Sequence, residues 1–182
     1  MRNTITFASA VFVFSLTATP LASAADDGDL ITSAEAAAPT AVSSKAAIYA
    51  MGADGKMRTL REGSNGFWCM PDDPTTPGPD PMCGDANSME WAMAWMGHKD
   101  PPKGKTGLIY MLMGGPAASN LDPFATTPAE GSDWIMDRPH LMIVNFGESM
   151  AGYPNMQDKP DTTQPYVMWG GTPYAHLMVP VQ

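Results

Sequence analysis

Short apolar runs separated by turn residues dominate the first half of the folded chain. Residues 46–51 (AAIYAM) form one such run and residues 57–60 (MRTL) the next. Between them, residues 52–56 (GADGK) tolerate a positive φ, so the pattern predicts a β-hairpin. Asn65-Gly66 then predicts a turn into a third run, which begins at Phe67.

A helix is predicted over residues 85–96. Asp85 is placed to cap its first turn, and Gly97 to end its last turn. Two faces of this helix are apolar: one carries Met89, Met93 and Met96, and the other carries Trp91, Trp95 and His98. Since a helix that is apolar on two sides is usually enclosed, we expect it to lie between two layers.

Later apolar runs predict the rest of a sheet. They lie at residues 106–113, 140–144, 165–169 and 175–179. The segment 116–133 is interrupted by Pro and Gly and predicts a loop. About five to six short strands with one main helix predict an α+β domain with a mostly antiparallel sheet.

The first 24 residues have the composition of a secretory signal. Arg2 supplies the positive start, residues 5–17 are apolar or small, and Ala22-Ser23-Ala24 fits the cleavage pattern. A run of this length is too short to cross a bilayer, which needs about 20 apolar residues, so we expect no membrane insertion.

Residues 25–44 are acidic at first and then rich in Ala, Ser and Thr, without apolar periodicity. They predict a flexible leader with at most one frayed helical turn. We therefore expect a signal peptide at 1–24, a leader at 25–44, a single globular domain at 45–182, and export to the periplasm or the extracellular space.

The two cysteines, Cys69 and Cys83, are expected to form a disulfide, because an exported chain meets an oxidising compartment. Five prolines lie between them, so the intervening segment cannot form a helix or an inner strand. We expect a stiff surface loop closed at its base by the disulfide. In the chain-entropy description, a ring of about 15 residues contributes about 3 kcal/mol to the free energy of unfolding.

Several segments together resemble a family of uncharacterised exported bacterial proteins. They are NGFWCMPDDPTTPGPDPMC around the cysteines, MEWAMAWMGH, PPKGKTGLIYMLMGG, ASNLDPFA and TPYAHLMVPV. The resemblance covers residues 46–180 and implies export and a single domain. It implies no activity, ligand or catalytic residue.

Acidic residues outnumber basic ones, with 19 Asp and Glu against 10 Lys and Arg and a formal net charge of −9. Nucleic-acid binding needs clustered Lys and Arg, and anionic membrane surfaces attract basic segments. The charge therefore predicts no nucleic-acid partner and leaves a small molecule or a protein as the partner.

The histidines His98, His140 and His176 are the candidate metal ligands. In the similar runs HLMIV and HLMVP, His140 shares a strand face with Met142, and His176 shares one with Met178. If these strands are neighbours, two His–Met pairs converge and His98 joins them from the helix end, a ligand set that favours copper. The alternative is that each histidine binds a carbonyl at the end of a strand. We expect no resident cofactor, with copper or zinc as the alternative.

Methionine is unusually frequent, with 16 in the chain. Six of them lie in periodic apolar elements, which is typical of a core: Met89, Met93, Met111, Met113, Met142 and Met178. Soft-metal binding and the trapping of oxidants at the surface are the alternatives.

The loop at residues 114–123 follows a strand and supplies the remaining candidates for ligand binding, Ser119, Asn120 and Asp122. Asn120 and Asp122 equally suit turns. The sequence contains no nucleophile elbow, phosphate loop, dinucleotide fingerprint or zinc-protease motif. The best interpretation is an extracytoplasmic binding or structural module without catalytic activity. The alternative is a copper- or zinc-dependent periplasmic protein or enzyme that uses the three histidines.

Overall fold

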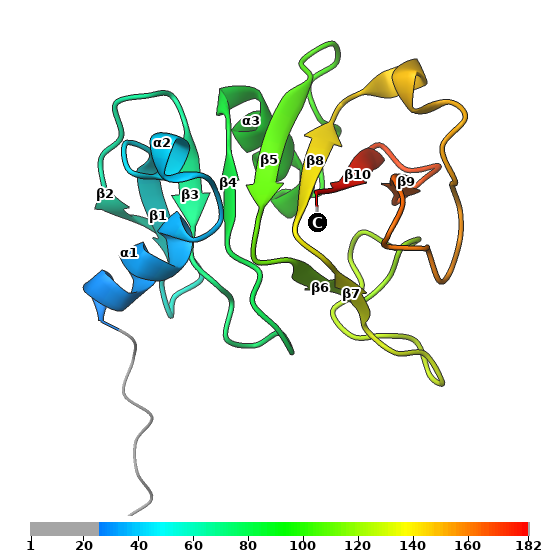
Figure 1. The fold of residues 1–182 in the computed structure, drawn as a ribbon, viewed down its shortest axis with the longest axis horizontal. Helices are drawn as coiled ribbons and strands as arrows, with labels where there is room; N and C mark the ends of the chain where they lie inside the picture. The colour runs from blue at the N-terminus through cyan, green and yellow to red at the C-terminus, as the bar shows by residue number, and fades with distance from the viewer. Residues whose placement is uncertain (1–25, 182) are drawn as a thin grey trace, which may run out of the picture.

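A computed structural model of the chain describes residues 26–181, in which helices cover both faces of a large sheet (Figure 1). The helices are α1 (Asp27–Glu35), α2 (Thr40–Ser43) and α3 (Ala86–Met96), with a 3-10 turn, η1, at Gly147–Met150. The strands are β1 (Ala47–Met51), β2 (Met57–Arg61), β3 (Trp68–Met70), β4 (Met82–Gly84), β5 (Gly107–Met111), β6 (Gly115–Ala117), β7 (Ile135–Asp137), β8 (His140–Val144), β9 (Tyr166–Met168) and β10 (His176–Pro180). The predicted signal peptide, residues 1–24, lies outside the described residues.

The main sheet has eight strands in the order β2-β1-β3-β4-β5-β8-β10-β9. Neighbouring strands in this sheet are antiparallel, except β1 and β3, which are parallel. The mixed α and β content and the single main helix are confirmed, but the sheet is larger than the predicted five to six strands. The additional strands β3 and β4 have three residues each, too few to produce an alternating pattern. Strands β6 and β7 form a separate two-stranded sheet at the two ends of the segment 116–133, which was predicted as a loop.

The predicted hairpin is confirmed. Strands β1 and β2 are antiparallel, and Met51 lies opposite Met57 next to the turn. Gly55 has a φ of +73°, as the turn residues led us to expect. The disulfide between Cys69 and Cys83 is also present, and the two cysteines are direct partners in β3 and β4.

Helices α1 and α2 replace the flexible leader that the sequence predicted for residues 25–44. Asp26 caps α1 by accepting a hydrogen bond from the Asp29 backbone N–H. Ala34 and Ala37 are fully buried against the sheet, in a cluster that includes both cysteines. The prediction was wrong because alanine is only weakly hydrophobic, so a helix that buries alanines shows no clear apolar periodicity. The small side chain of alanine nevertheless lets the helix approach the sheet closely.

Helix α3 covers the opposite face of the sheet from α1 and α2 (Figure 1). Its predicted caps are confirmed, since Asp85 accepts a hydrogen bond from the Ser88 N–H at 2.8 Å and Gly97 follows the last turn. The helix packs so closely that a Cβ on Gly107 would stand 2.5 Å from the Ser88 nitrogen, so this position requires glycine.

Only one of the two apolar faces of α3 is enclosed. Trp91 is buried against the sheet, whereas Met93 is 48% exposed and Met96 is 42% exposed. The expectation that both faces lie between layers was wrong, because no second layer covers the outer face among residues 26–181.

Within the described part of the chain, no helix combines the length and apolar character required to span a bilayer.

Candidate functional site

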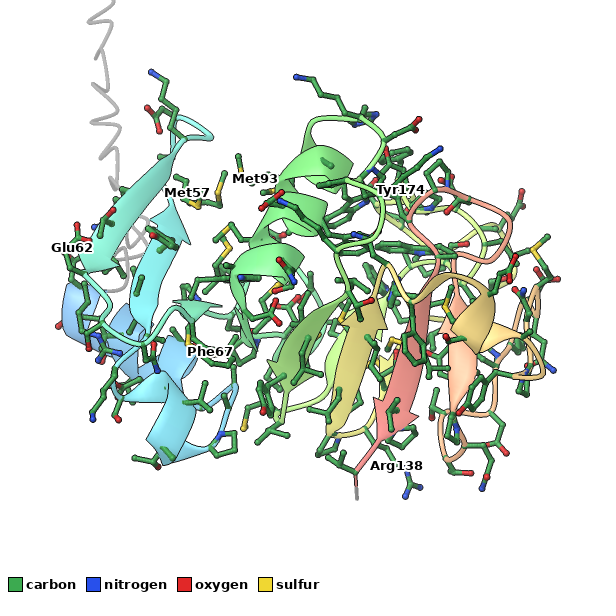
Figure 2. The ribbon with its side chains drawn as sticks, turned by 90° about the horizontal axis from the view of Figure 1, so that it is seen from above. Met57, Glu62, Phe67, Met93, Arg138 and Tyr174 are labelled. Carbon is green, nitrogen blue, oxygen red and sulfur yellow. A yellow bond between two sulfur atoms is a disulfide. The ribbon has the colours of Figure 1, made fainter. Side chains whose placement is uncertain are left out.

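A groove lies between the β1–β2 hairpin and α3, on the side of the sheet that α3 covers (Figure 2). Its deeper part is a hollow of about 310 Å³. The side chains around it are largely apolar and come from the hairpin, β3 and the helix: Ala47, Tyr49, Glu62, Phe67, Trp68 and Met89. The groove thus joins elements that are far apart in the sequence.

Met89 lines this hollow, and exposed methionines lie on the hairpin and on α3 near it. Met51 is 50% exposed and Met57 36% exposed, and they face each other across β1 and β2. Met51 shares its strand face with Tyr49, which lines the hollow. On α3, Met89 is partly buried and Met93, one turn later, is exposed. We call Met51, Met57, Met89 and Met93 the methionine groove.

The two sides of the methionine groove face each other. Figure 2 shows Met57 on the hairpin and Met93 on α3 directed toward the gap between these elements. A second hollow of about 490 Å³ continues over the outer face of α3 and includes both Met89 and Met93. The two hollows share Met89.

Charged groups of both signs lie beside the two hollows. Glu62 lines the first hollow, and Glu90, Lys99 and Asp100 line the second. The ammonium group of Lys105 donates to both carboxylate oxygens of Glu90 at 2.7 Å. Over the two hollows together, only the net charge of −9 of the whole chain therefore favours a cationic or basic ligand over an anion.

The predicted His–Met strands are neighbours, and Met142 lies directly opposite Met178. The antiparallel register, however, places His140 opposite Pro180 and His176 opposite Val144. The two histidines therefore lie at opposite ends of the β8–β10 ladder, about 13 Å apart along the strands.

His98 does not belong to this ladder. It is exposed after the end of α3 and stacks on Phe124, with ring centroids 4.0 Å apart. The structure does not bring the three histidines around one point. Within residues 26–181, no three His, Cys, Asp or Glu side chains are grouped so that they could hold a metal ion.

Both buried histidines bind a backbone carbonyl, as the alternative interpretation held. Nδ1 of His140 lies 2.7 Å from the Arg138 carbonyl oxygen, and Nδ1 of His176 lies 2.9 Å from that of Tyr174. Burial lowers the pKa of both imidazoles, that of His176 to about 4. Both rings are therefore neutral at pH 7, and each Nδ1–H donates to its carbonyl.

The aromatic cluster around His176 contains buried polar atoms without partners. The rings of Trp91 and Trp169 meet the imidazole edge-on, at centroid distances of 5.3 and 4.9 Å. Among the described residues, the unpartnered buried atoms are Nε1 of Trp91, Oδ1 of Asn120, and Nε2 of His140 and His176. This region is a packed core, and neither of the two hollows described above includes it.

The loop at residues 114–123 is stabilised by hydrogen bonds of Ser119, Asn120 and Asp122. The Ser119 hydroxyl accepts hydrogen bonds from the backbone N–H groups of Leu121 and Asp122, both at 3.0 Å. Asn120 is buried and donates to the Gln157 carbonyl, while Asp122 accepts from the Phe124 N–H. Asp122 thus has the turn-forming role that the sequence left open, whereas Asn120 links the loop to a distant part of the chain.

A partly buried acid that sequence reasoning missed, Asp137 on β7, lies against β9. The Tyr166 hydroxyl donates to Oδ1 of Asp137 at 2.7 Å. Burial raises the pKa of the Asp137 carboxyl to about 6, although the hydrogen bond from Tyr166 opposes this change. The two residues are 29 positions apart, so no local motif could have revealed the pair.

The methionine groove was also missed, although part of its signal was visible. The spacing of Met89 and Met93 places them on one helical face, but the sequence suggested core packing for both. Exposure of that face depends on where the hairpin lies, which the spacing does not reveal.

These observations define an α+β protein with a mixed eight-stranded sheet and an apolar groove between a hairpin and a helix. Comparisons of the chain with models of protein families, with curated proteins and with solved structures found no match. The resemblance to exported bacterial proteins therefore stays a prediction.

Proposed function

We propose that the protein is an extracytoplasmic binding module without catalytic activity, and that the methionine groove is its binding surface. The observation that carries this proposal is the gathering of exposed apolar side chains beside a hollow. Met51, Met57 and Met93 are each at least one-third exposed; Met51 shares a strand face with Tyr49 of the first hollow, and Met93 lines the second hollow. Contiguous exposed apolar surface next to a concavity commonly marks a ligand site.

The chemistry of methionine supports a binding role. Its unbranched thioether side chain has several rotatable bonds, so it adapts to the shape of a ligand better than Leu or Ile does. The hairpin and α3 provide a rigid frame, because β1 pairs with both β2 and β3 and α3 is capped by Asp85. A mobile surface on a fixed frame suits recognition.

The alternative, a copper or zinc centre of His98, His140 and His176, has less support. The β8–β10 register separates His140 from His176, and both rings use Nδ1 to bind a carbonyl. The export component of the proposal rests on residues 1–24 and on the paired cysteines.

The groove is tested with the dye bis-ANS, whose fluorescence rises on binding to apolar surface. We expect Met57→Asp and Met93→Asp each to reduce the dye affinity, because a carboxylate in the groove repels an anionic apolar probe. Met136→Asp is the matched control, since Met136 is 51% exposed on β7. Equal dye binding by the groove variants and the wild type would contradict the proposal, as would an equal loss in the control.

A further inference from the structure

The first hollow of the groove has two aromatic residues in its wall. Tyr49 lies on β1 and Trp68 on the neighbouring strand β3, and both line the hollow. Ala47 lies directly opposite Trp68 in the parallel β1–β3 ladder, so Tyr49 is two positions further along the same strand face. The spacing of a sheet places the Cα atoms of such diagonal neighbours about 8 Å apart. Because alanine is small, the sheet stays open between the two aromatic residues.

Helix α3 supplies the wall that faces this part of the sheet. Met89 lines the hollow from the helix and belongs, with Tyr49 and Trp68, to the apolar cluster on the α3 side of the sheet. Phe67 packs into the cluster on the other side, where its ring centroid lies 6.5 Å from that of Tyr110. The aromatic rings available to a ligand in the hollow are therefore those of Tyr49 and Trp68.

The polar groups at the hollow favour a cation. The indole Nε1–H of Trp68 donates to the Asp85 carbonyl oxygen at 2.9 Å and lies 3.2 Å from the Ser88 hydroxyl, so it is not free to bind an anion. Among the described residues, Glu62 is the only charged one that lines this hollow, and it belongs to none of their ion pairs. The first hollow thus combines two aromatic residues with a carboxylate that has no cationic partner.

Aromatic rings attract a cation that lies over the ring face within about 6 Å of the centroid. Two rings on residues about 8 Å apart can therefore both contact one cation between them. A quaternary ammonium group suits such a place, because its alkyl groups cover the charge and pack against apolar walls. A hard metal ion would instead need several oxygen ligands. The volume of the hollow, about 310 Å³, is that of a small-molecule site.

We propose that the first hollow binds a quaternary ammonium cation between Tyr49 and Trp68, with the carboxylate of Glu62 as counter-charge. This inference rests on the proposed function, because it names the ligand class of the same surface. It gives the methionines no donor role, and Met89 contributes only an apolar wall.

The test compares two ligands of the same shape by isothermal titration calorimetry of the purified protein. Choline chloride is the cationic probe, titrated at an ionic strength held constant with sodium chloride. The neutral probe is 3,3-dimethyl-1-butanol, in which carbon replaces the charged nitrogen. We expect choline to bind at least about 5-fold more tightly, because two cation–π contacts are lost with the charge. Equal affinities, or no binding of choline, would overturn the proposal.

Variants of Tyr49 test whether the ring or only its apolar volume matters. Tyr49→Leu should weaken choline binding at least about 3-fold, whereas Tyr49→Phe keeps the ring and should bind as the wild type does. Tyr153→Leu is the control, since Tyr153 is 40% exposed and lies outside the hollow. Unchanged choline affinity in Tyr49→Leu, or equal losses in Tyr49→Phe or the control, would contradict a cation held by the ring.

The role of the carboxylate is tested by a pair of variants that change the net charge equally. Glu62→Gln should weaken choline binding about 2- to 5-fold, as expected for an exposed ion pair. Glu148→Gln removes one negative charge at an exposed position outside the hollow and should change the affinity less. Equal effects of the two variants would overturn the assignment of Glu62.

A quaternary ammonium group occurs both in free solutes and in lipid headgroups, and vesicles of phosphatidylcholine distinguish them. Sedimentation of the protein with the vesicles, reversed by choline, would assign the site to a headgroup. Choline binding without sedimentation would assign it to a free solute.

The bis-ANS measurement separates this inference from the proposed function. Choline that fails to bind, while Met57→Asp and Met93→Asp still reduce the dye affinity, would overturn the quaternary ammonium site and leave the binding groove standing. Dye binding that is unchanged in those two variants would contradict the groove even if choline binds. Melting temperatures within a few degrees of the wild type confirm that the variants of Tyr49 and Glu62 are folded.

Discussion

Asp137 carries a carboxyl group whose protonation depends on the fold. Its pKa is about 6 in the folded protein and 3.8 in an ordinary environment, because burial disfavours the charged form. Between pH 4 and 6 the folded protein therefore holds a proton that the unfolded chain has released. The free energy of unfolding falls as the pH rises through this window, by at most about 3 kcal/mol from this group.

The histidines contribute in the opposite direction. Burial lowers the pKa of His176 to about 4, so the unfolded chain binds a proton that the folded protein lacks between pH 4 and 6.5. The same sign holds for His140. Their contribution to the free energy of unfolding rises with pH, and it masks that of Asp137 in the wild type.

The variant Asp137→Asn isolates the contribution of the Asp137 carboxyl to the pH dependence of stability, because asparagine still accepts the hydrogen bond from Tyr166 but does not titrate. We expect the free energy of unfolding of this variant, relative to the wild type, to increase by about 1–3 kcal/mol between pH 4 and pH 7. The contribution of the histidines cancels in this difference. Urea unfolding at several pH values measures it, with the exposed Asp133→Asn as control. A difference independent of pH would rule out the raised pKa.

At the scale of elements, local signals predicted the β1–β2 hairpin and α3 well. Asp85, Gly97 and the turn at residues 52–56 act through bonds to near neighbours in the sequence, so their effect can be read without the fold. Helix α1 has no comparable apolar stripe. Its burial depends on small alanine side chains and on a sheet whose strands follow it in the sequence, so apolar periodicity within α1 could not reveal that burial.

Two alanines test whether α1 is part of the folded domain. Ala34 is fully buried and Ala36 is exposed, although they are two residues apart. We expect Ala34→Leu to lower the free energy of unfolding by about 1–3 kcal/mol, because the added volume has no space against the sheet. Ala36→Leu should change it by less than about 0.5 kcal/mol. Urea unfolding compares the two, and equal stabilities would show that α1 is not packed.

At the scale of the whole molecule, strand register decides which candidate residues lie close together. The HLMIV and HLMVP runs correctly indicated strands, and those strands are neighbours. Only the antiparallel register shows that His140 and His176 lie at opposite ends. The methionine groove likewise depends on the distance between a hairpin and a helix that are joined through β3 and β4. Neither relation is encoded in local spacing.

The disulfide links the two halves of this arrangement, because β3 and β4 connect the hairpin side of the sheet to β5. Cys69 and Cys83 are fully buried beneath α1, so removal by mutation is a cleaner test than chemical reduction. The bond spans 14 positions, and loop closure of this size contributes about 3 kcal/mol. We expect Cys69→Ala/Cys83→Ala to lower the melting temperature by about 6–12 °C.

The single variant Cys69→Ala, which leaves one thiol in the core, should melt no higher than the double variant. A double variant that melts with the wild type would show that the packing of α1 and the neighbouring strands alone holds β3 and β4 together.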